Sequence, residues 1–532
     1  MIADHRTQTG KAENIADHSS VRGERLVSNV LWNWLFIAFS VPVALVFSPY
    51  IIRKLGADGY GMWVLASSLI GYYTMLDFGS RSAVVRYCAH YRATGEHGRI
   101  NELMSTVVAG MIVIVLSLVP VTMILSHLVN SWFNIPPSFH HVVPLTVLLL
   151  GLGAGLGLMS SLFSGLVDGF QRFDVENQNR IVAFVIQYVG GVVVLALGYG
   201  LVAMGLLALV AGVVSVALYR VRAKQVFPAL RLSWRLVRYS ALCQVFRFGM
   251  PTLLSEVARQ CIQQNPIVLI GYYLAPAFVG FYSLPVRLLQ TAADVVSRVG
   301  IVAGPQAAEL LALGRPDLVA RLGTYANRYC LTLYTPLGIM GTLYGQEILQ
   351  LWVGSEFGAR SGPVLAILVA GGLLAQAGQF SSSAILFGLG RHAGFAYGLL
   401  GEAAVSLAGM ILIVPRFGIV GAAVLSAVLM VAVRGLLTPW MLCRYLGANY
   451  GSYMASIFVR PLLTALPIWG LVHVCKLWVW PGQSWLDVIA AACFTGVIYF
   501  GAAVQTCLDH EHRLLVLNWL SRCREQISLR WT

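Results

Sequence analysis

The sequence predicts an all-α protein that crosses a membrane many times. Of its 532 residues, 58% are hydrophobic and only 11% are charged, and the mean hydropathy is +0.75. Soluble domains carry about 25% charged residues. About fourteen apolar runs are long enough to span a bilayer as helices, and the gaps between them reach only about twenty residues. The length of the runs, and the lack of ten-residue alternation, favour helices over a barrel.

The expected spans follow one another along the whole chain. Met1–Ser28 is polar, and the first apolar run is too long for a removable signal peptide, so we expect a retained first helix. The predicted spans are residues 29–52, 60–78, 102–126, 142–167, 178–199, 201–219, 244–271, 277–297, 322–344, 363–387, 393–414, 418–442, 453–475 and 485–507. The short gaps leave no room for a soluble catalytic domain.

The distribution of lysine and arginine predicts the orientation in the membrane. An even number of spans places both termini on one side. With the N-terminus inside, 27 of the 36 Lys and Arg residues lie on the inner side and five lie outside. This bias predicts cytoplasmic N- and C-termini, and the net charge of +14 then reflects topology and attraction to anionic membrane lipids. No basic domain stands apart from the membrane, so nucleic acid is not an expected partner.

An internal repeat with a shift of 219 residues suggests two related halves. The shift aligns eight identical residues: Leu55, Gly61, Leu65, Leu69, Ala89, Ala93, Gly95 and Leu103 fall on Leu274, Gly280, Leu284, Leu288, Ala308, Ala312, Gly314 and Leu322. An offset of six helices keeps both copies in the same orientation. We therefore expect a cytoplasmic segment (1–28), two six-helix bundles (29–221 and 241–445) joined by a basic linker (222–240), two additional helices (446–508) and a cytoplasmic tail (509–532).

Two neighbouring spans carry polar groups along one helical face. The first has Glu256, Arg259, Gln260, Gln263 and Gln264 at helical spacing, and the second has Arg287, Gln290, Thr291, Asp294 and Arg298. A charge at the bilayer centre costs about 2.5–3.5 kcal/mol. These groups are therefore expected to face either a wet cavity or one another.

Further polar side chains within the spans complete the candidate site. We expect substrate or cavity contacts from Arg259, Gln260, Gln263, Arg287, Arg328, Asn33, Gln376 and Gln379. Ion coupling or simple charge pairing is expected for Glu256, Asp294 and Glu402, and a gate or anchor at the cytoplasmic helix end for Asp77, Arg81 and Arg86. Pairing of Glu256 with Arg259 remains an alternative to cavity lining. The nine cysteines are scattered without a C-x-x-C pair, so neither a metal site nor a cofactor is expected.

Several short motifs resemble the polysaccharide transport family of the MOP (multidrug/oligosaccharidyl-lipid/polysaccharide) exporters. Each motif is weak alone, and their order and spacing carry the resemblance. They are Leu55-Gly56, Tyr60-Gly61-Met62-Trp63, Leu76-Asp77-Phe78-Gly79, Arg86-Tyr87, Phe248-Gly249-Met250-Pro251, Val279-Gly280-Phe281-Tyr282, Arg287-Leu288 and Gly304-Pro305. Many relatives keep an aspartate after the polar stretch of helix seven, where this chain has Asn265-Pro266. That departure shifts any coupling role toward Glu256.

The resemblance implies a V-shaped pair of bundles around a central cavity. It also implies reorientation of an undecaprenyl-pyrophosphate-linked oligosaccharide, of the O-antigen or exopolysaccharide type, from the inner to the outer leaflet of the bacterial cytoplasmic membrane by alternating access. Other polysaccharide-assembly membrane proteins are then possible partners. Arginines suit the pyrophosphate, and amides suit the sugars.

Three other functions compete with this reading. A drug or cation antiporter of the MATE type would favour acidic groups in its lumen, whereas arginine predominates here. A lipid II flippase is compatible with the same scaffold. An O-antigen polymerase or ligase would need a large outer loop, and the outer loops here are short. The sequence therefore predicts a transporter and not an enzyme.

Overall fold

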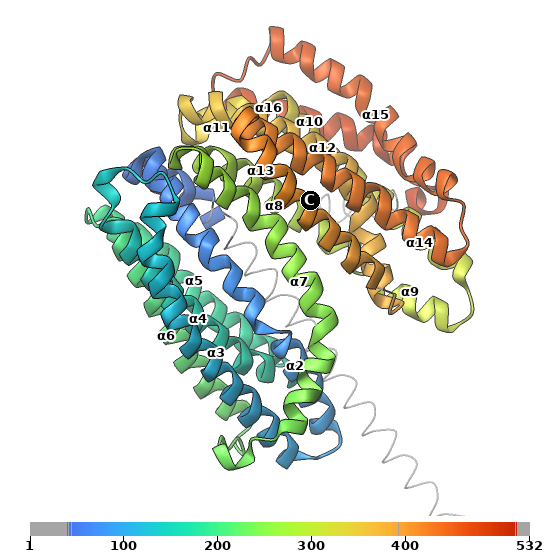
Figure 1. Ribbon diagram of the computed structural model, residues 1–532. Coiled ribbons are helices and arrows are strands. Elements are labelled where there is room, and N and C mark those ends of the chain that lie inside the picture. Colours follow the sequence, from blue (N-terminus) through green and yellow to red (C-terminus); the bar gives the residue numbers. More distant parts are fainter. Residues whose placement is uncertain (1–39, 41, 44, 392, 516–517, 519–532) are drawn as a thin grey trace, which may run out of the picture. The chain divides into compact units, whose positions relative to one another are not determined.

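The computed structural model describes residues 40, 42–43, 45–391, 393–515 and 518, without the side chains of 251–252 and 376–377. These residues form helices and contain no strand (Figure 1). Eight of the described helices are long and apolar enough to cross a membrane, and one of them (Ala393–Leu446) contains two of the expected spans. The prediction of an all-α, multi-pass membrane protein is confirmed.

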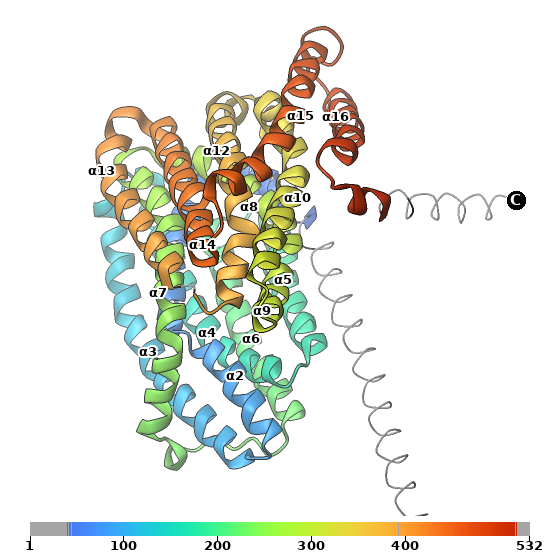
Figure 2. The same cartoon turned by 90° about the vertical axis from the view of Figure 1, so that its right-hand side faces the viewer.

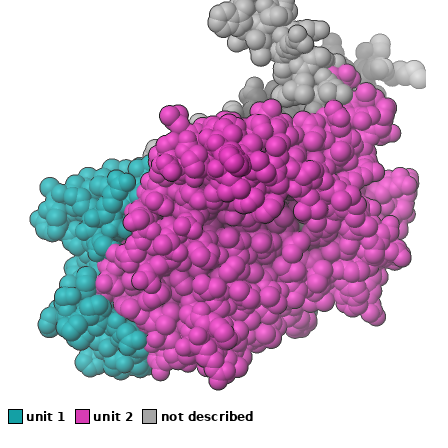
Figure 3. Space-filling model, turned by 90° about the horizontal axis from the view of Figure 1, so that it is seen from above, with its two compact units in different colours: residues 1–56, 66–253 teal, residues 57–65, 254–532 magenta. Residues whose placement is uncertain are grey.

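The chain forms two compact units, residues 1–56 with 66–253 and residues 57–65 with 254–532 (Figure 3). The first unit contains part of the helical stretch 45–71, a 3-10 turn (η1, Tyr72–Asp77) and the first part of α7 (Tyr239–Tyr273). Between them lie α2 (Ser80–Ala93), α3 (His97–Trp132), α4 (Val142–Gly169), α5 (Phe173–Ala196) and α6 (Leu201–Val226).

Small residues let α4 lie at the centre of the first unit, where it packs against α2, α3, α5 and α6. A Cβ on Gly153 would come within 2.8 Å of the Ala208 carbonyl oxygen of α6, and one on Gly151 within 2.3 Å of the Thr122 methyl of α3. Close approach through small residues is a common basis of helix packing in membranes. The glycines of α4 therefore set the spacing of this bundle.

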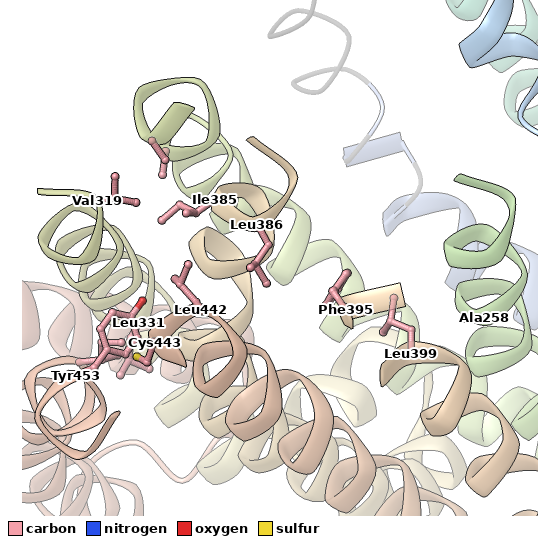
Figure 4. Packing of buried hydrophobic residues seen from close by; sticks show 13 residues of the cluster. Ala258, Val319, Leu331, Ile385, Leu386, Phe395, Leu399, Leu442, Cys443 and Tyr453 are labelled. Atoms are coloured by element: carbon pink, nitrogen blue, oxygen red, sulfur yellow. The ribbon is translucent and has the colours of Figure 1, made fainter. Parts of the chain in front are cut away.

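The second unit is built around α12 (Ser355–Gly388), which packs against most of its neighbours (Figure 2). The other helices are α8 (Pro276–Gly300), α9 (Ala303–Ala312), α10 (Pro316–Leu343), α11 (Gly345–Val353), α13 (Ala393–Met430), η4 (Val431–Leu437), α14 (Thr438–Leu446), α15 (Tyr450–Trp478) and α16 (Trp485–Thr506). The last two pack on each other and on α10. A buried apolar cluster joins α10, α12, α13, α14 and α15 (Figure 4).

Two glycines with left-handed backbone angles break long helical stretches. Gly56 (φ 74°) divides the stretch 45–71, and Gly418 (φ 58°) divides α13 between the two spans expected there. Glycine adopts this conformation without the steric penalty that a Cβ brings. After the second break, the chain forms a π-helix, η4, around Arg434. A π-helical turn is uncommon and is often found at functional positions.

The glycines that the repeat aligns form a reciprocal contact within the second unit. A Cβ on Gly61 would lie 1.9 Å from the carbonyl oxygen of Pro276, at the start of α8. A Cβ on Gly280 would lie 3.0 Å from the Tyr60 ring and 3.6 Å from the Ala57 carbonyl oxygen. Pro276 is itself the equivalent of Ala57 at the 219-residue shift. Equivalent positions therefore contact one another, as in a twofold interface.

A second close contact joins two motif stretches within the first unit. A Cβ on Gly249 would lie 2.3 Å from the Phe78 carbonyl oxygen, and one on Gly79 would lie 2.8 Å from the Gly249 Cα. The Arg86 guanidinium lies 4.5 Å from the centroid of the Phe248 ring. The motifs Leu76-Asp77-Phe78-Gly79 and Phe248-Gly249 are therefore points where α7 approaches η1 and α2.

Replacing Gly61 with alanine should destabilise the second unit, because the new methyl group meets backbone atoms that cannot rotate away. Overpacking of this kind costs about 1–3 kcal/mol. Thermal unfolding in detergent, followed by size-exclusion chromatography, would measure the loss. Gly401→Ala on α13 is the matched control, since nothing lies within 4 Å of its would-be Cβ. Equal behaviour of the two variants would contradict the close packing at Gly61.

Candidate polar site of α7 and α8

A ladder of hydrogen bonds runs along one face of α7. The Nη2 of Arg259 lies 2.6 Å from both carboxylate oxygens of Glu256, and its Nε donates to Oε2 at 3.1 Å. Gln260 Nε2 donates to Glu256 at 2.9 Å, and Gln264 Nε2 donates to Gln260 at 3.2 Å. The Arg259 side chain is 53% exposed, whereas Gln260 is buried. The ladder thus holds the Arg259 guanidinium in place, while about half of the Arg259 side chain stays exposed.

The polar side of α8 adds three charged groups. Arg287, Asp294 and Arg298 are exposed, whereas the opposite side of the helix buries Val279, Phe281, Leu284 and Leu289. Asp294 interacts electrostatically with Arg298 and with Arg259 of α7. Charged groups on the polar faces of the two helices therefore lie close enough to interact. We call these two faces together the α7–α8 face. The two faces together carry three guanidiniums, those of Arg259, Arg287 and Arg298, and the carboxylates of Glu256 and Asp294.

Two charges of the predicted set are paired elsewhere in the second unit. Arg328 of α10, with a side chain 4% exposed, donates from Nη2 to Asp509 at 2.9 Å. Glu402 of α13, 3% exposed, binds Arg434 of η4 through both carboxylate oxygens, at 3.0 and 3.2 Å. Each of these charges therefore has a counter-ion within the second unit.

The remaining predicted amides are only partly placed. Gln263 is half-buried on α7, and Gln379 is half-buried on α12, where its backbone carbonyl accepts a hydrogen bond from the Ser383 hydroxyl. The side chain of Gln376 and the whole of Asn33 lie outside the described residues. In the described part of the chain, no group of three His, Cys, Asp or Glu side chains could hold a metal ion.

Two of the three predicted gate residues, Asp77 and Arg81, belong to a charged cluster in the first unit, whereas Arg86 lies over the Phe248 ring. Arg81 donates from Nη2 to Asp168 at 2.9 Å and to Glu176 at 3.3 Å, and Glu176 also accepts from Ser164. Asp77 accepts hydrogen bonds from Ser80 and Ser161. Sequence reasoning did not assign Asp168 and Glu176 to the site. The sequence could have predicted that these two carboxylates lie close together. They stand on either side of the short loop between α4 and α5, at the same end of both helices.

Asp509 lies beyond α16 and titrates outside the membrane spans. Burial works to raise the pKa of this carboxyl, but the hydrogen bond from Tyr325 and the charge of Arg328 outweigh it and hold the pKa below its usual value. A lowered pKa in the folded state means that the carboxylate stabilises the fold above the unfolded-state pKa. That contribution disappears as the pH falls through the folded-state pKa.

We therefore expect Asp509→Asn to reduce thermal stability most at neutral pH. The gap to the wild type should close below about pH 3.9, the ordinary aspartate value. Melting temperatures of both proteins across a pH series would measure this convergence. A gap that stays constant down to the lowest pH would contradict the charge pairing of Asp509.

The comparisons with known proteins agree with this fold. Residues 26–310 match the family described as "Polysaccharide biosynthesis protein". A relative from Shigella flexneri that is named for O-antigen transport is 23% identical over 79% of this chain and 98% of its own length. The uncharacterised membrane protein EpsK of Bacillus subtilis is 21% identical over 92% and 97% of the two chains.

Solved structures with the same fold come from two groups of transporters. The lipid II flippase MurJ, in an inward closed conformation, aligns with a TM-score of 0.64 at 11% identity, over 90% of this chain and all of its own. An inward-facing multidrug resistance MATE transporter of the MOP superfamily aligns with a TM-score of 0.63 at 12% identity, over 76% of this chain and 98% of its own.

The chain has the fold of the MOP-superfamily transporter whose structure it matches. The chain belongs to the polysaccharide biosynthesis protein family, because that family's model matches more than half of it. The resemblance drawn from the sequence motifs is confirmed.

Proposed function

We propose that the protein is a flippase for lipid-linked oligosaccharides and not an enzyme. Its cargo is a polyprenyl-pyrophosphate-linked repeat unit, which it moves from the inner to the outer leaflet of the bacterial cytoplasmic membrane by alternating access. Membership of the polysaccharide biosynthesis family and the relative named for O-antigen transport support this proposal. The observation that carries it is a polar face on α7 and α8 from which charged side chains, those of Arg259, Arg287, Asp294 and Arg298, are exposed.

The chemistry of that face suits the headgroup of such a lipid. A pyrophosphate cannot cross hydrocarbon without a substitute for its hydration, and guanidiniums form strong charge-assisted hydrogen bonds to phosphates. Arg259 and Arg287 are the proposed phosphate contacts. The amides of Gln260, Gln263 and Gln264 are the proposed sugar contacts, with Asn33, Gln376 and Gln379 as further candidates.

We also propose that Glu256 couples ion movement to transport. Its carboxylate accepts hydrogen bonds from the Nε and Nη2 of Arg259. Protonation would weaken that pair and release the guanidinium for a phosphate, and arrival of a phosphate would displace the carboxylate. Asp294, which interacts electrostatically with the same guanidinium, is a second candidate for the proton.

A deletion strain provides the direct experiment. Loss of the protein should cause polyprenyl-linked repeat units to accumulate on the inner leaflet, and mass spectrometry would give their sugar composition. Accumulation of lipid II would instead identify a peptidoglycan precursor as the cargo. Normal lipid-linked intermediates, together with sensitivity to drugs, would replace the flippase proposal with a drug antiporter.

The position in the cell follows from the same proposal. With the inner side set by the lysine and arginine bias, both termini lie in the cytoplasm of the producing bacterium. Polysaccharide-assembly proteins that extend or ligate the repeat unit on the outer side are the expected partners.

A further inference from the structure

The contacts of Arg328 indicate a second anion site, formed by α10 and α15. The Nη2 of Arg328 on α10 and the Nη1 of Arg460 on α15 both donate to the same oxygen, Oδ1 of Asp509, at 2.9 and 3.0 Å. Two guanidiniums from different helices therefore converge on one point. Convergent guanidiniums of this kind are typical of phosphate sites, since a phosphate offers several acceptor oxygens where a carboxylate offers two.

The pair of arginines is not saturated by its carboxylate. The Nε of Arg328 is buried and has no hydrogen-bond partner among the described residues. Tyr325 and Tyr329 flank the guanidinium, with ring centroids 5.3 and 5.7 Å from its central carbon. A buried, unsatisfied guanidinium donor is costly. A ligand with more acceptor oxygens than Asp509 would satisfy it.

Polar and aromatic contacts hold the described segment that carries Asp509. His512 accepts or donates a hydrogen bond with the Tyr329 hydroxyl at 2.5 Å and stacks edge-on against Tyr325 and Tyr329. None of the residues 508–515 is fully buried, and Leu514 and Leu515 are 45% and 67% exposed. The described residues of this segment therefore bury little apolar surface.

We infer that Arg328 and Arg460 form a phosphate-binding site and that the Asp509 carboxylate is its displaceable resident. The site has two positive charges against one negative charge, and Arg321 adds a third positive charge within electrostatic reach of Tyr325. The lowered pKa of Asp509 keeps the resident anionic at physiological pH. The ligand is a phosphate group, either from an inner-leaflet phospholipid or from a soluble pyrophosphate. The inference does not depend on lipid transport.

Binding by the purified full-length protein tests the inference. Asp509→Asn removes the carboxylate that competes with a ligand for Arg328 and Arg460. Inorganic pyrophosphate should therefore bind this variant about tenfold more tightly than the wild type, because a larger fraction of the protein is ready to bind it. Isothermal titration calorimetry would measure this. Adding Arg460→Gln, at a half-exposed position, should abolish the gain. Asp317→Asn, which removes a surface carboxylate paired with Arg315, is the matched control and should behave as the wild type.

A lipid arm distinguishes the two sources of phosphate. In nanodiscs, native mass spectrometry would count the phosphatidylglycerol retained by each variant, with phosphatidylcholine as the reference. A gain for Asp509→Asn with phosphatidylglycerol alone identifies a headgroup, and a gain with pyrophosphate alone identifies a soluble ligand. The inference is overturned if neither ligand binds Asp509→Asn more tightly, or if the gain survives Arg460→Gln.

Asp509→Asn also leaves Arg328 without its counter-ion, so its stability is measured in parallel. The variant should melt below the wild type, and the phosphate ligand should raise its melting temperature more than that of the wild type. Equal ligand-induced shifts in the two proteins would count against the site in the same way as unchanged affinity.

Discussion

Replacing Glu402 with glutamine should destabilise the second unit by about 3–5 kcal/mol, because it strands Arg434 without a counter-ion. Glu402 is 3% exposed, and the Arg434 side chain is 20% exposed. The pair also joins α13 to η4, where the backbone is already in an uncommon helical form. Denaturant unfolding in micelles, followed by tryptophan fluorescence, would measure the change.

Two further variants separate pairing from packing. Removing both charges together, as in Glu402→Leu with Arg434→Met, should restore most of the loss, since well-packed apolar residues often replace a buried ion pair without cost. Glu356→Gln breaks an exposed pair with Arg360 and should cost no more than about 1 kcal/mol. A double variant no more stable than Glu402→Gln would show that the pair matters for something other than charge balance.

Replacing Arg259 with alanine should reduce transport of the lipid-linked oligosaccharide by about tenfold or more. A hydrogen bond to a charged group contributes about 1.5–3 kcal/mol, and 1.4 kcal/mol is a factor of ten in affinity. The loss should persist at every pH, because the guanidinium itself is absent. Complementation of a deletion strain, together with flipping in proteoliposomes, would measure it.

Comparison with two other variants tests the proposed roles on α7. Glu256→Gln should leave transport measurable but insensitive to a pH gradient, since it removes the group proposed to carry the proton. Arg360→Ala, at an exposed arginine of the same unit, should transport as the wild type. Wild-type transport by Arg259→Ala would remove this residue from the mechanism.

The helical fold could be predicted from the sequence, because the apolar runs and the gaps between them are local patterns. The break expected between residues 414 and 418 coincides with the left-handed Gly418, and the glycines aligned by the repeat, Gly61 and Gly280, contact each other's helix. A π-helix at 431–437 could not be predicted in this way, because its sequence has the same composition and periodicity as an ordinary helix.

The candidate site was predictable only where its partners lie on one helix. The spacing of Glu256, Arg259 and Gln260 is enough to suggest their hydrogen bonds. Arg328 and Asp509 are separated by 181 positions, and Arg81 and Asp168 by 87. Such pairs depend on which helix faces pack together, and a single sequence carries no local signal for that.

The exchange of residues 57–65 into the second unit has a consequence for how this chain can be divided. If the gene were divided within the linker (222–240), the N-terminal fragment would contain residues 57–65, which belong to the second unit. The C-terminal fragment would then expose the start of α8, where Pro276 normally meets Gly61. Neither fragment should fold alone, and co-expression of both should be required to recover either one.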